Sequence, residues 1–201
     1  LSAPACNPIS SPVLCHQDGS VRAKCCNLVG NLCRHSAAFY PQLSEAGVLE
    51  PLLRCLTDPH ESTRKFAAFA VGNAVFHDSS LCVPLKAAVP ALVRLLADAE
   101  RVRANAAGAL GNFVRHGDAV LAELIEGGAP EALLQLVTST APSDKPDSAY
   151  SIALFTLGSL APYPQCRQLP VFQRIVAALK TLPPSPPLER FFKKLAAGVN
   201  S

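Results

Sequence analysis

The sequence predicts an all-α protein, a right-handed α-solenoid of about four stacked repeats, and three observations support this fold class. The first is a recurring segment: residues 102–116 read VRANAAGALGNFVRH, residues 21–35 read VRAKCCNLVGNLCRH, and residues 63–77 read TRKFAAFAVGNAVFH. A more divergent copy at 150–163 reads YSIALFTLGSLAPY. The central glycines of the four copies are Gly30, Gly72, Gly111 and Gly158, with spacings of 42, 39 and 47 residues. A period of this size is typical of stacked helical repeats.

The second observation is the composition, which suits stacked helices. Hydrophobic residues make up 49% of the 201 residues, while only 6% are aromatic and Trp is absent. Stacked repeats need no single large core, because each unit buries its apolar face against its neighbours. Many of the 18 prolines, such as Pro51, Pro90 and Pro130, stand where a helix would begin, a position that tolerates proline.

The third observation is the order of elements within a unit. Each copy of the recurring segment predicts a long buried helix, which a short helix and then a Pro-bearing amphipathic helix follow. The predicted ranges are 21–35, 39–47 and 48–56; then 61–77, 81–87 and 88–96; then 102–116, 119–125 and 129–137. Three helices per unit favour armadillo repeats. HEAT repeats are the alternative, but they have two helices per unit, and the short helix argues against them.

The last part of the chain continues the pattern with two changes. The polar segment 138–148, TSTAPSDKPDS, is an inserted loop that explains the longest spacing. A buried helix at 150–161 and an amphipathic helix at 171–182 follow, and then a stiff PPSPP spacer at 183–187. We expect the helix at 188–199 to cap the solenoid, with Phe192, Leu195, Ala196 and Val199 on its buried stripe.

These elements define the expected domain organisation. Residues 1–20 form an N-terminal loop or partial repeat, and residues 21–182 form the armadillo repeats, approximately 21–60, 61–99, 100–148 and 149–182. Residues 183–201 form the Pro-rich spacer and the C-terminal capping helix. The recurring glycine is unfavourable inside a helix by roughly 1 kcal/mol relative to Ala. Its recurrence predicts that neighbouring helices approach closely there, and we expect Gly111→Leu to destabilise the fold.

Several functional classes receive no support from the sequence. The net charge of +3 is too small to indicate a nucleic-acid partner. No apolar run reaches the ~18–20 residues that cross a bilayer, and residues 1–20 lack the pattern of a signal peptide. The chain has no initiator methionine, which suggests a fragment of a longer protein.

Cysteine and histidine do not form a recognisable metal site. The eight cysteines contain no C-x-x-C pair, and most lie in apolar helical segments. We therefore expect reduced, structural thiols in an intracellular protein, with disulfides or metal as the alternatives. His35, His77 and His116 recur at one repeat position, but successive repeats separate them by ~10 Å, which is too far for one metal ion. The predicted role of each is to end its helix, where the helix dipole favours it.

No catalytic signature is present: the chain lacks G-x-G-x-x-G, G-x-x-x-x-G-K-[ST], G-x-S-x-G, H-E-x-x-H and H-R-D. We therefore expect no catalytic residues, no metal, no cofactor and no small-molecule substrate. The basic clusters Arg64-Lys65 and Arg101/Arg103 are expected to lie in solvent at the starts of helices.

Asn31, Asn73 and Asn112 recur in phase within apolar helices and are the candidate functional residues. Asparagine is unfavourable inside a helix and needs a hydrogen-bond partner when it is buried. One interpretation is structural, with each amide tying its helix to the loop of the next repeat. The other is a ladder of amides along a concave groove, where they would bind the main chain of an extended partner. The predicted groove residues are Asn31, Arg34, Phe69, Asn73, Asn105, Asn112 and Arg115.

The segment NAAGALGNFVRH at 105–116 resembles the third helix of armadillo repeats in β-catenin and importin-α. That resemblance implies that the in-phase Asn binds partner main chain and that a Trp four residues earlier packs beside it. Here the Trp positions hold Asn27, Phe69, Gly108 and Phe155, and the fourth Asn position holds Ser159. The Trp–Asn ladder that recognises nuclear localisation signals is therefore missing, which argues against cargo import.

A closer resemblance covers nearly the whole chain. GNLCRHSAAFYPQLSEAGVLEPLLRCLTDPHESTRKFAAFAVGNAVFHD (30–78), RANAAGALGNFVRH and SIALFTLGSLAPYPQCRQL (151–169) are similar to the C-terminal armadillo-repeat region of Fused-type serine/threonine protein kinases. In that family the kinase domain is N-terminal, so the resemblance implies that this chain is a non-catalytic part of a longer kinase. It also implies protein partners, kinesin-like or microtubule-associated, and roles in central-pair assembly of motile cilia, Hedgehog signalling or plant cytokinesis.

The sequence thus predicts a protein-binding scaffold that is not itself an enzyme. The resemblance places it in the cytoplasm, on the cytoskeleton or in the axoneme of a cilium or flagellum, with no nucleic-acid or membrane partner. The alternative is a structural component of a ciliary or microtubule-associated assembly, which would be held through its convex face and ends and would keep the asparagines internal.

Overall fold

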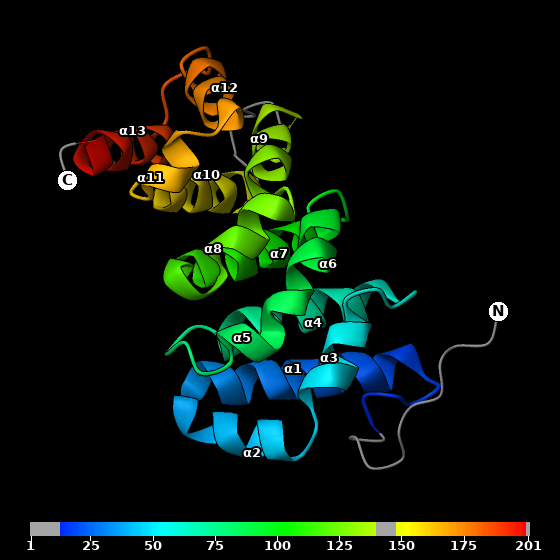
Figure 1. Ribbon diagram of the computed structural model, residues 1–201. Helices are drawn as coiled ribbons and strands as arrows, with labels where there is room; N and C mark the ends of the chain where they lie inside the picture. The colour runs from blue at the N-terminus through cyan, green and yellow to red at the C-terminus, as the bar shows by residue number, and fades with distance from the viewer. Residues whose placement is uncertain (1–12, 140–147, 200–201) are drawn as a thin grey trace.

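Figure 1 shows the computed structural model, which describes residues 13–139 and 148–199. Within these ranges the chain forms α-helices and two short 3-10 helices, and no strand. The helices stack as successive layers from the blue end of the molecule to the red end, so the shape is that of a solenoid. The predicted all-α armadillo fold is confirmed.

The longest helices form the central stack. Each packs along the next in the order α1 (Gly19–His35), α4 (Glu61–Ala74), α7 (Glu100–Val114), α10 (Ser148–Leu160) and α13 (Pro186–Val199). Short helices follow each of the first four: α2 (Tyr40–Glu45), α5 (Cys82–Leu85), α8 (Gly117–Glu126) and α11 (Pro164–Arg167). The remaining helices are α3 (Leu49–Cys55), α6 (Val89–Leu95), α9 (Ala129–Ser139) and α12 (Pro170–Leu179), and the 3-10 helices are η1 (Ala37–Phe39) and η2 (Lys86–Ala88). Each of the first four layers therefore has the three helices that distinguish armadillo from HEAT repeats.

The long helices begin and end close to the predicted positions. Asp18 caps α1 by accepting a hydrogen bond from the backbone N–H of Ser20 at 2.7 Å. The predicted dipole role holds for His35 alone, because α4 ends at Ala74 and α7 at Val114, before His77 and His116. An imidazole nitrogen of His77 instead lies 2.9 Å from the Arg34 carbonyl oxygen on the preceding long helix.

Glycines allow the long helices to approach closely, as the sequence predicted. A Cβ added to Gly72 would lie 3.0 Å from the Cα of Ala109 in α7. A Cβ added to Gly111 would lie 2.7 Å from the Thr156 hydroxyl oxygen in α10. Both distances are shorter than ordinary van der Waals contact, so any larger side chain would push the helices apart.

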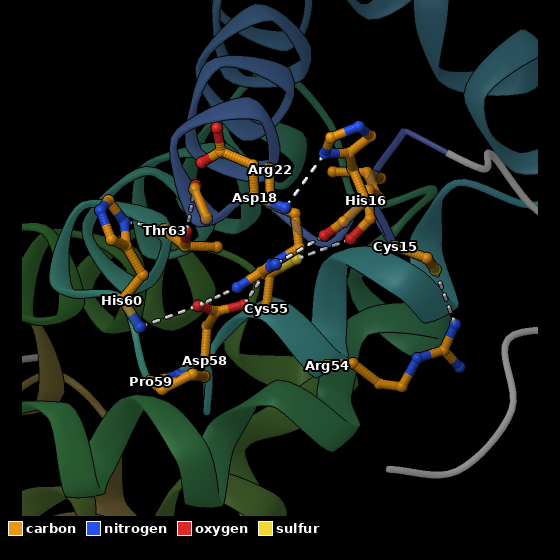
Figure 2. Close-up of polar contacts among 12 residues, drawn as sticks. Cys15, His16, Asp18, Arg22, Arg54, Cys55, Asp58, Pro59, His60 and Thr63 are labelled. Atoms are coloured by element: carbon orange, nitrogen blue, oxygen red, sulfur yellow. Dashed lines mark hydrogen bonds and ion pairs between the residues drawn. The ribbon is translucent and has the colours of Figure 1, made fainter.

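Paired arginine and aspartate side chains also join successive layers. Figure 2 shows Arg22 of α1 bound to Asp58, which lies just before α4, with N···O distances of 2.6 and 2.8 Å. Arg64 of α4 binds Asp98, just before α7, at 2.7 and 2.9 Å. The Arg64 side chain is only 21% exposed, so the expectation that it lies in solvent is wrong. The Arg64 bond lowers the pKa of Asp98.

Helix α13 differs from its prediction in the residues that it buries. It begins at Pro186, inside the predicted spacer, and its buried side chains are Leu188 and Phe191. Phe192 and Leu195 are half-buried and Ala196 is exposed, so the predicted stripe is rotated around the helix. This difference arises because α13 packs along α10 in the way that α10 packs along α7, as a further long helix of the stack.

The cysteines are mostly buried free thiols. Cys25, Cys26, Cys33, Cys55, Cys82 and Cys166 are free, as expected. Cys15 is disulfide-bonded, which contradicts the expectation for that residue. Burial raises the pKa of Cys33, Cys82 and Cys166 to about 11, which keeps these thiols protonated at neutral pH. Among the described residues no group of His, Cys, Asp and Glu could hold a metal ion, and none of their helices is long and apolar enough to cross a membrane.

Candidate functional site

One position recurs on every helix of the central stack. In α7, Ala109 faces Gly72 of the preceding long helix, and Asn112 comes three residues after Ala109. In α13, Phe191 faces Gly158 of α10 in the same way. Lys194, three residues beyond Phe191, therefore occupies the asparagine position of α13. The recurring position holds Asn31, Asn73, Asn112, Ser159 and Lys194.

The asparagine amides tie neighbouring long helices together. The Asn73 Nδ2 donates to the Gly30 carbonyl oxygen at 3.0 Å, and the Asn112 Nδ2 donates to the Gly72 carbonyl oxygen at 2.9 Å. Asn105 makes the equivalent bond to the Lys65 carbonyl oxygen at 3.1 Å. The partner in each case is the preceding helix, not the loop of the next repeat. The Oδ1 atoms of these three amides accept no hydrogen bond from the described residues.

Asn31 and Arg34 do not line the groove that four of the other predicted residues share. They stand on α1, which has no preceding long helix among the described residues. The exposed Asn31 amide donates only to Asn27 on its own helix, at 3.3 Å, and Arg34 is also exposed. The end of the stack is apolar here as well, because Leu28 is 60% exposed.

Four of the predicted residues line one groove between α4, α7 and α10, which we name the central groove. Its volume is about 230 Å³. Phe69, Asn73, Asn105 and Asn112 supply its aromatic and amide groups, and Ile152 lies at its α10 side. Its other lining residues are small: Ala68, Gly72, Ala104, Gly108 and Ala109. Small residues leave room for the main chain of a bound segment to approach the amides.

The seventh predicted residue, Arg115, lines a neighbouring cavity of about 440 Å³, which we name the C-terminal pocket. Its lining residues are Val114, Arg115, Gly158, Ser159, Pro162, Tyr163, Lys194 and Ala197. The Arg115 guanidinium lies 4.7 Å from the centre of the Phe76 ring. The Lys194 ammonium lies 3.7 Å from the Phe155 ring and donates to the Ser159 hydroxyl oxygen at 2.9 Å.

Sequence reasoning did not predict Lys194 as a site residue. The only available signal was its spacing from the earlier asparagines, and that spacing was hidden because α13 carries no Gly-Asn pair. Burial lowers the pKa of Lys194.

The chain resembles known proteins both in sequence and in structure. It is 38% identical over 159 residues to serine/threonine-protein kinase 36 of Pongo abelii, which covers 78% of this chain and 12% of the kinase. It is 36% identical over 184 residues to serine/threonine-protein kinase TIO of Arabidopsis thaliana, which covers 86% of this chain and 14% of that kinase. The chain thus matches only a small part of each relative. No family model matches it.

The solved structures agree on the fold. A designed armadillo-repeat protein in complex with the peptide (KR)4 superposes with a TM-score of 0.81 at 22% identity, covering 93% of this chain and 79% of the designed one. The predicted resemblance to Fused-type kinases is confirmed by the sequence relatives. The chain is an armadillo-repeat solenoid homologous to a segment of the Fused-type serine/threonine-protein kinases.

Proposed function

We propose that this chain is a non-catalytic scaffold whose central groove binds an extended segment of a partner protein. The observation that carries the proposal is the set of amides at Asn73, Asn105 and Asn112. Their Oδ1 atoms accept no hydrogen bond from the described residues, and small Ala and Gly residues line the groove around them.

The chemistry of these amides suits a main-chain ligand. Every residue of an extended segment other than proline offers one N–H donor and one C=O acceptor. Because Nδ2 of each asparagine already binds the preceding helix, the orientation of the amide is held, and Oδ1 is left to accept a peptide N–H. Long helices that pack ~8–10 Å apart would present one amide for roughly every three residues of an extended chain.

Two further facts support this proposal. Phe69 lines the groove beside the amides, and an aromatic ring there would pack against a side chain of the bound segment. Structural neighbours with this fold bind peptides: one carries (KR)4, and another was designed for modular peptide recognition.

The finer roles in this proposal rest on what the resemblance to Fused-type kinases implies. We propose that the longer parent carries an N-terminal kinase domain and that the solenoid docks kinesin-like or microtubule-associated partners. The cellular setting would be cilium and central-pair assembly, Hedgehog-type signalling or cytokinesis, with the protein in the cytoplasm, on the cytoskeleton or in the axoneme.

The end of the stack favours a second candidate, a structural component of a ciliary or microtubule-associated assembly. Leu28 of α1 is at the position that Ala70 and Ala109 occupy in α4 and α7. Those alanines are 0% and 1% exposed against the preceding helix, whereas Leu28 is 60% exposed. An apolar side chain at this position is suited to stacking against a further helix, whether of the longer parent or of a neighbouring protein in an assembly.

A substitution at Gly108 separates the two candidates. This glycine lines the central groove, and a Cβ placed on it would lie 3.9 Å from Ile152, so a larger side chain can enter the groove without a backbone clash. A random 12-residue peptide library is selected on the wild-type chain and sequenced. The selected peptides are then titrated against wild type and Gly108→Phe, with Val83→Ser on the exposed surface of α5 as the control.

The proposal expects Gly108→Phe to weaken peptide binding at least about tenfold, while Val83→Ser binds as wild type and neither variant melts below the wild-type temperature. If the library yields no peptide, or if its peptides bind Gly108→Phe as well as wild type, the groove is not the binding site. The assembly candidate would then be preferred.

A further inference from the structure

We propose that the C-terminal pocket binds the carboxylate of an Asp or Glu side chain, so that the extended partner segment is acidic where it passes Arg115 and Lys194. This inference rests on the proposed function, because it specifies the chemistry of the segment that the central groove would hold.

The first argument is that Arg115 and Lys194 form no ion pair with any described residue. Other cations of the chain do: Arg22 binds Asp58, Arg64 binds Asp98, and Arg174 binds Glu131. The described contacts of Arg115 and Lys194 are instead with the rings of Phe76 and Phe155 and with the Ser159 hydroxyl. Two cations without an anion thus line the same cavity.

The second argument is that both cations keep donors for a ligand. A lysine ammonium has three N–H donors, and Ser159 accepts one of those on Lys194. A guanidinium that stacks on a ring, as Arg115 does on Phe76, still presents its planar edge, which matches a carboxylate with two parallel hydrogen bonds.

The third argument is that the surroundings strengthen attraction to an anion. Val114, Pro162 and Ala197 give the pocket an apolar lining, and the Lys194 side chain is half-buried there, where charge interactions strengthen as the local dielectric falls. Burial has already removed part of the hydration of Lys194, which lowers its pKa. Hydrogen bonds to a bound carboxylate would replace the hydration that this ammonium group has lost.

The fourth argument is that the lining of this part of the surface carries no opposing charge. Among the described residues, no Asp or Glu lines the central groove or the C-terminal pocket. The adjoining cavity on the far side of Lys194 is also without an acidic residue and adds a third cation, Arg190. A basic segment would therefore meet only repulsion here, and an acidic segment is the complementary partner.

The test uses three end-blocked, fluorescein-labelled peptides, (EA)5, (QA)5 and (KA)5, in polarisation titrations at about 0.1 M salt. The inference expects (EA)5 to bind at least about tenfold more tightly than (QA)5, because hydrogen bonds between ionised groups are stronger than neutral ones, and it expects no binding of (KA)5. Arg115→Gln and Lys194→Gln should each remove most of the preference for (EA)5.

The matched control is Lys193→Gln, which makes the same charge change on the exposed face of the same helix. It should leave (EA)5 binding within about twofold of wild type, and Arg115→Gln tests the inference even if Lys194→Gln perturbs α13. Equal binding of (EA)5 and (QA)5, or equal losses at Lys193 and Lys194, would overturn the inference. Failure here together with Gly108-sensitive binding of library peptides would leave the proposed function standing.

Discussion

At the scale of single residues, Asn73 and Asn31 have the same position in the repeat but different energetic roles. The Asn73 amide bonds across to Gly30 on the preceding helix, whereas the Asn31 amide bonds, among the described residues, only to Asn27 on its own helix. We expect Asn73→Ala to lower the free energy of unfolding by about 1 kcal/mol, the net value of a typical hydrogen bond. We expect Asn31→Ala to be neutral or slightly stabilising, because Ala has the higher helix propensity.

Urea denaturation of the two variants and wild type, followed by circular dichroism, measures this difference. Equal losses at the two positions would show that the cross-helix bond contributes nothing beyond helix propensity.

These two residues also show how far the sequence could predict the site. The recurrence of Gly-Asn predicted which residues are in phase, and four of the seven predicted residues line one groove. The recurrence could not show that the Nδ2 atoms are already engaged, because each acceptor lies 40 or more residues away in the chain. Nor could it distinguish Asn31, since that difference depends on what stands beside α1 in space.

At the scale of helices, Gly72 and Gly108 lie on the central stack but have different surroundings. A Cβ on Gly72 would lie 3.0 Å from the backbone of Ala109, whereas a Cβ on Gly108 would have no neighbour nearer than 3.9 Å. We expect Gly72→Ala to destabilise the fold by about 1–3 kcal/mol, because α4 and α7 must separate. Gly108→Ala should stabilise it by about 0.5–1 kcal/mol through helix propensity.

Melting temperatures of the two variants test this pair against wild type. A Gly72→Ala chain that melts at or above the wild-type temperature would contradict the role of this glycine as the close-contact point.

The helices also show why one element was predicted less well than the others. The first three long helices share the Gly-Asn signal, and their approximate ranges followed from it. Helix α13 has no such signal and follows a Pro-rich segment, so its buried face had to be predicted from apolar spacing alone. Phe191 and Phe192 are adjacent, and the packing of α13 along α10, where Phe191 lies beside Gly158, decides that Phe191 is the more buried of the two.

At the scale of the whole molecule, the repeat period was sufficient to predict the stacking of layers. It did not predict the ion pairs that join them. Arg22 and Asp58 are 36 residues apart, and Arg64 and Asp98 are 34 apart, and the two pairs occupy equivalent positions in successive layers. A charged side chain at the start of a helix is usually solvated, and the sequence offers no sign that these arginines turn toward the next layer.

These pairs predict that the solenoid is sensitive to acid. The hydrogen bond from Arg64 lowers the pKa of Asp98 in the fold. A carboxyl group whose folded pKa is below its unfolded value of about 3.9 stabilises the fold above that value, and the contribution disappears as the pH falls through the folded pKa. Asp58 acts in the same direction: burial opposes its ionisation, but the bonds from Arg22 and the His60 N–H outweigh burial and lower its pKa.

We therefore expect the wild-type melting temperature to be steady near neutral pH and to fall between about pH 5 and pH 3. Asp98→Asn should melt lower than wild type at pH 7, by an amount that corresponds to about 1 kcal/mol, because the pair is partly exposed. The difference should shrink as the pH falls, since protonation removes the same interaction from wild type.

Glu45→Gln is the control, because Glu45 is exposed and forms no ion pair with a described residue. Its curve should follow wild type at every pH. Melting curves for wild type and Asp98→Asn that stay parallel down to pH 3 would show that the Arg64 pair does not hold the layers together.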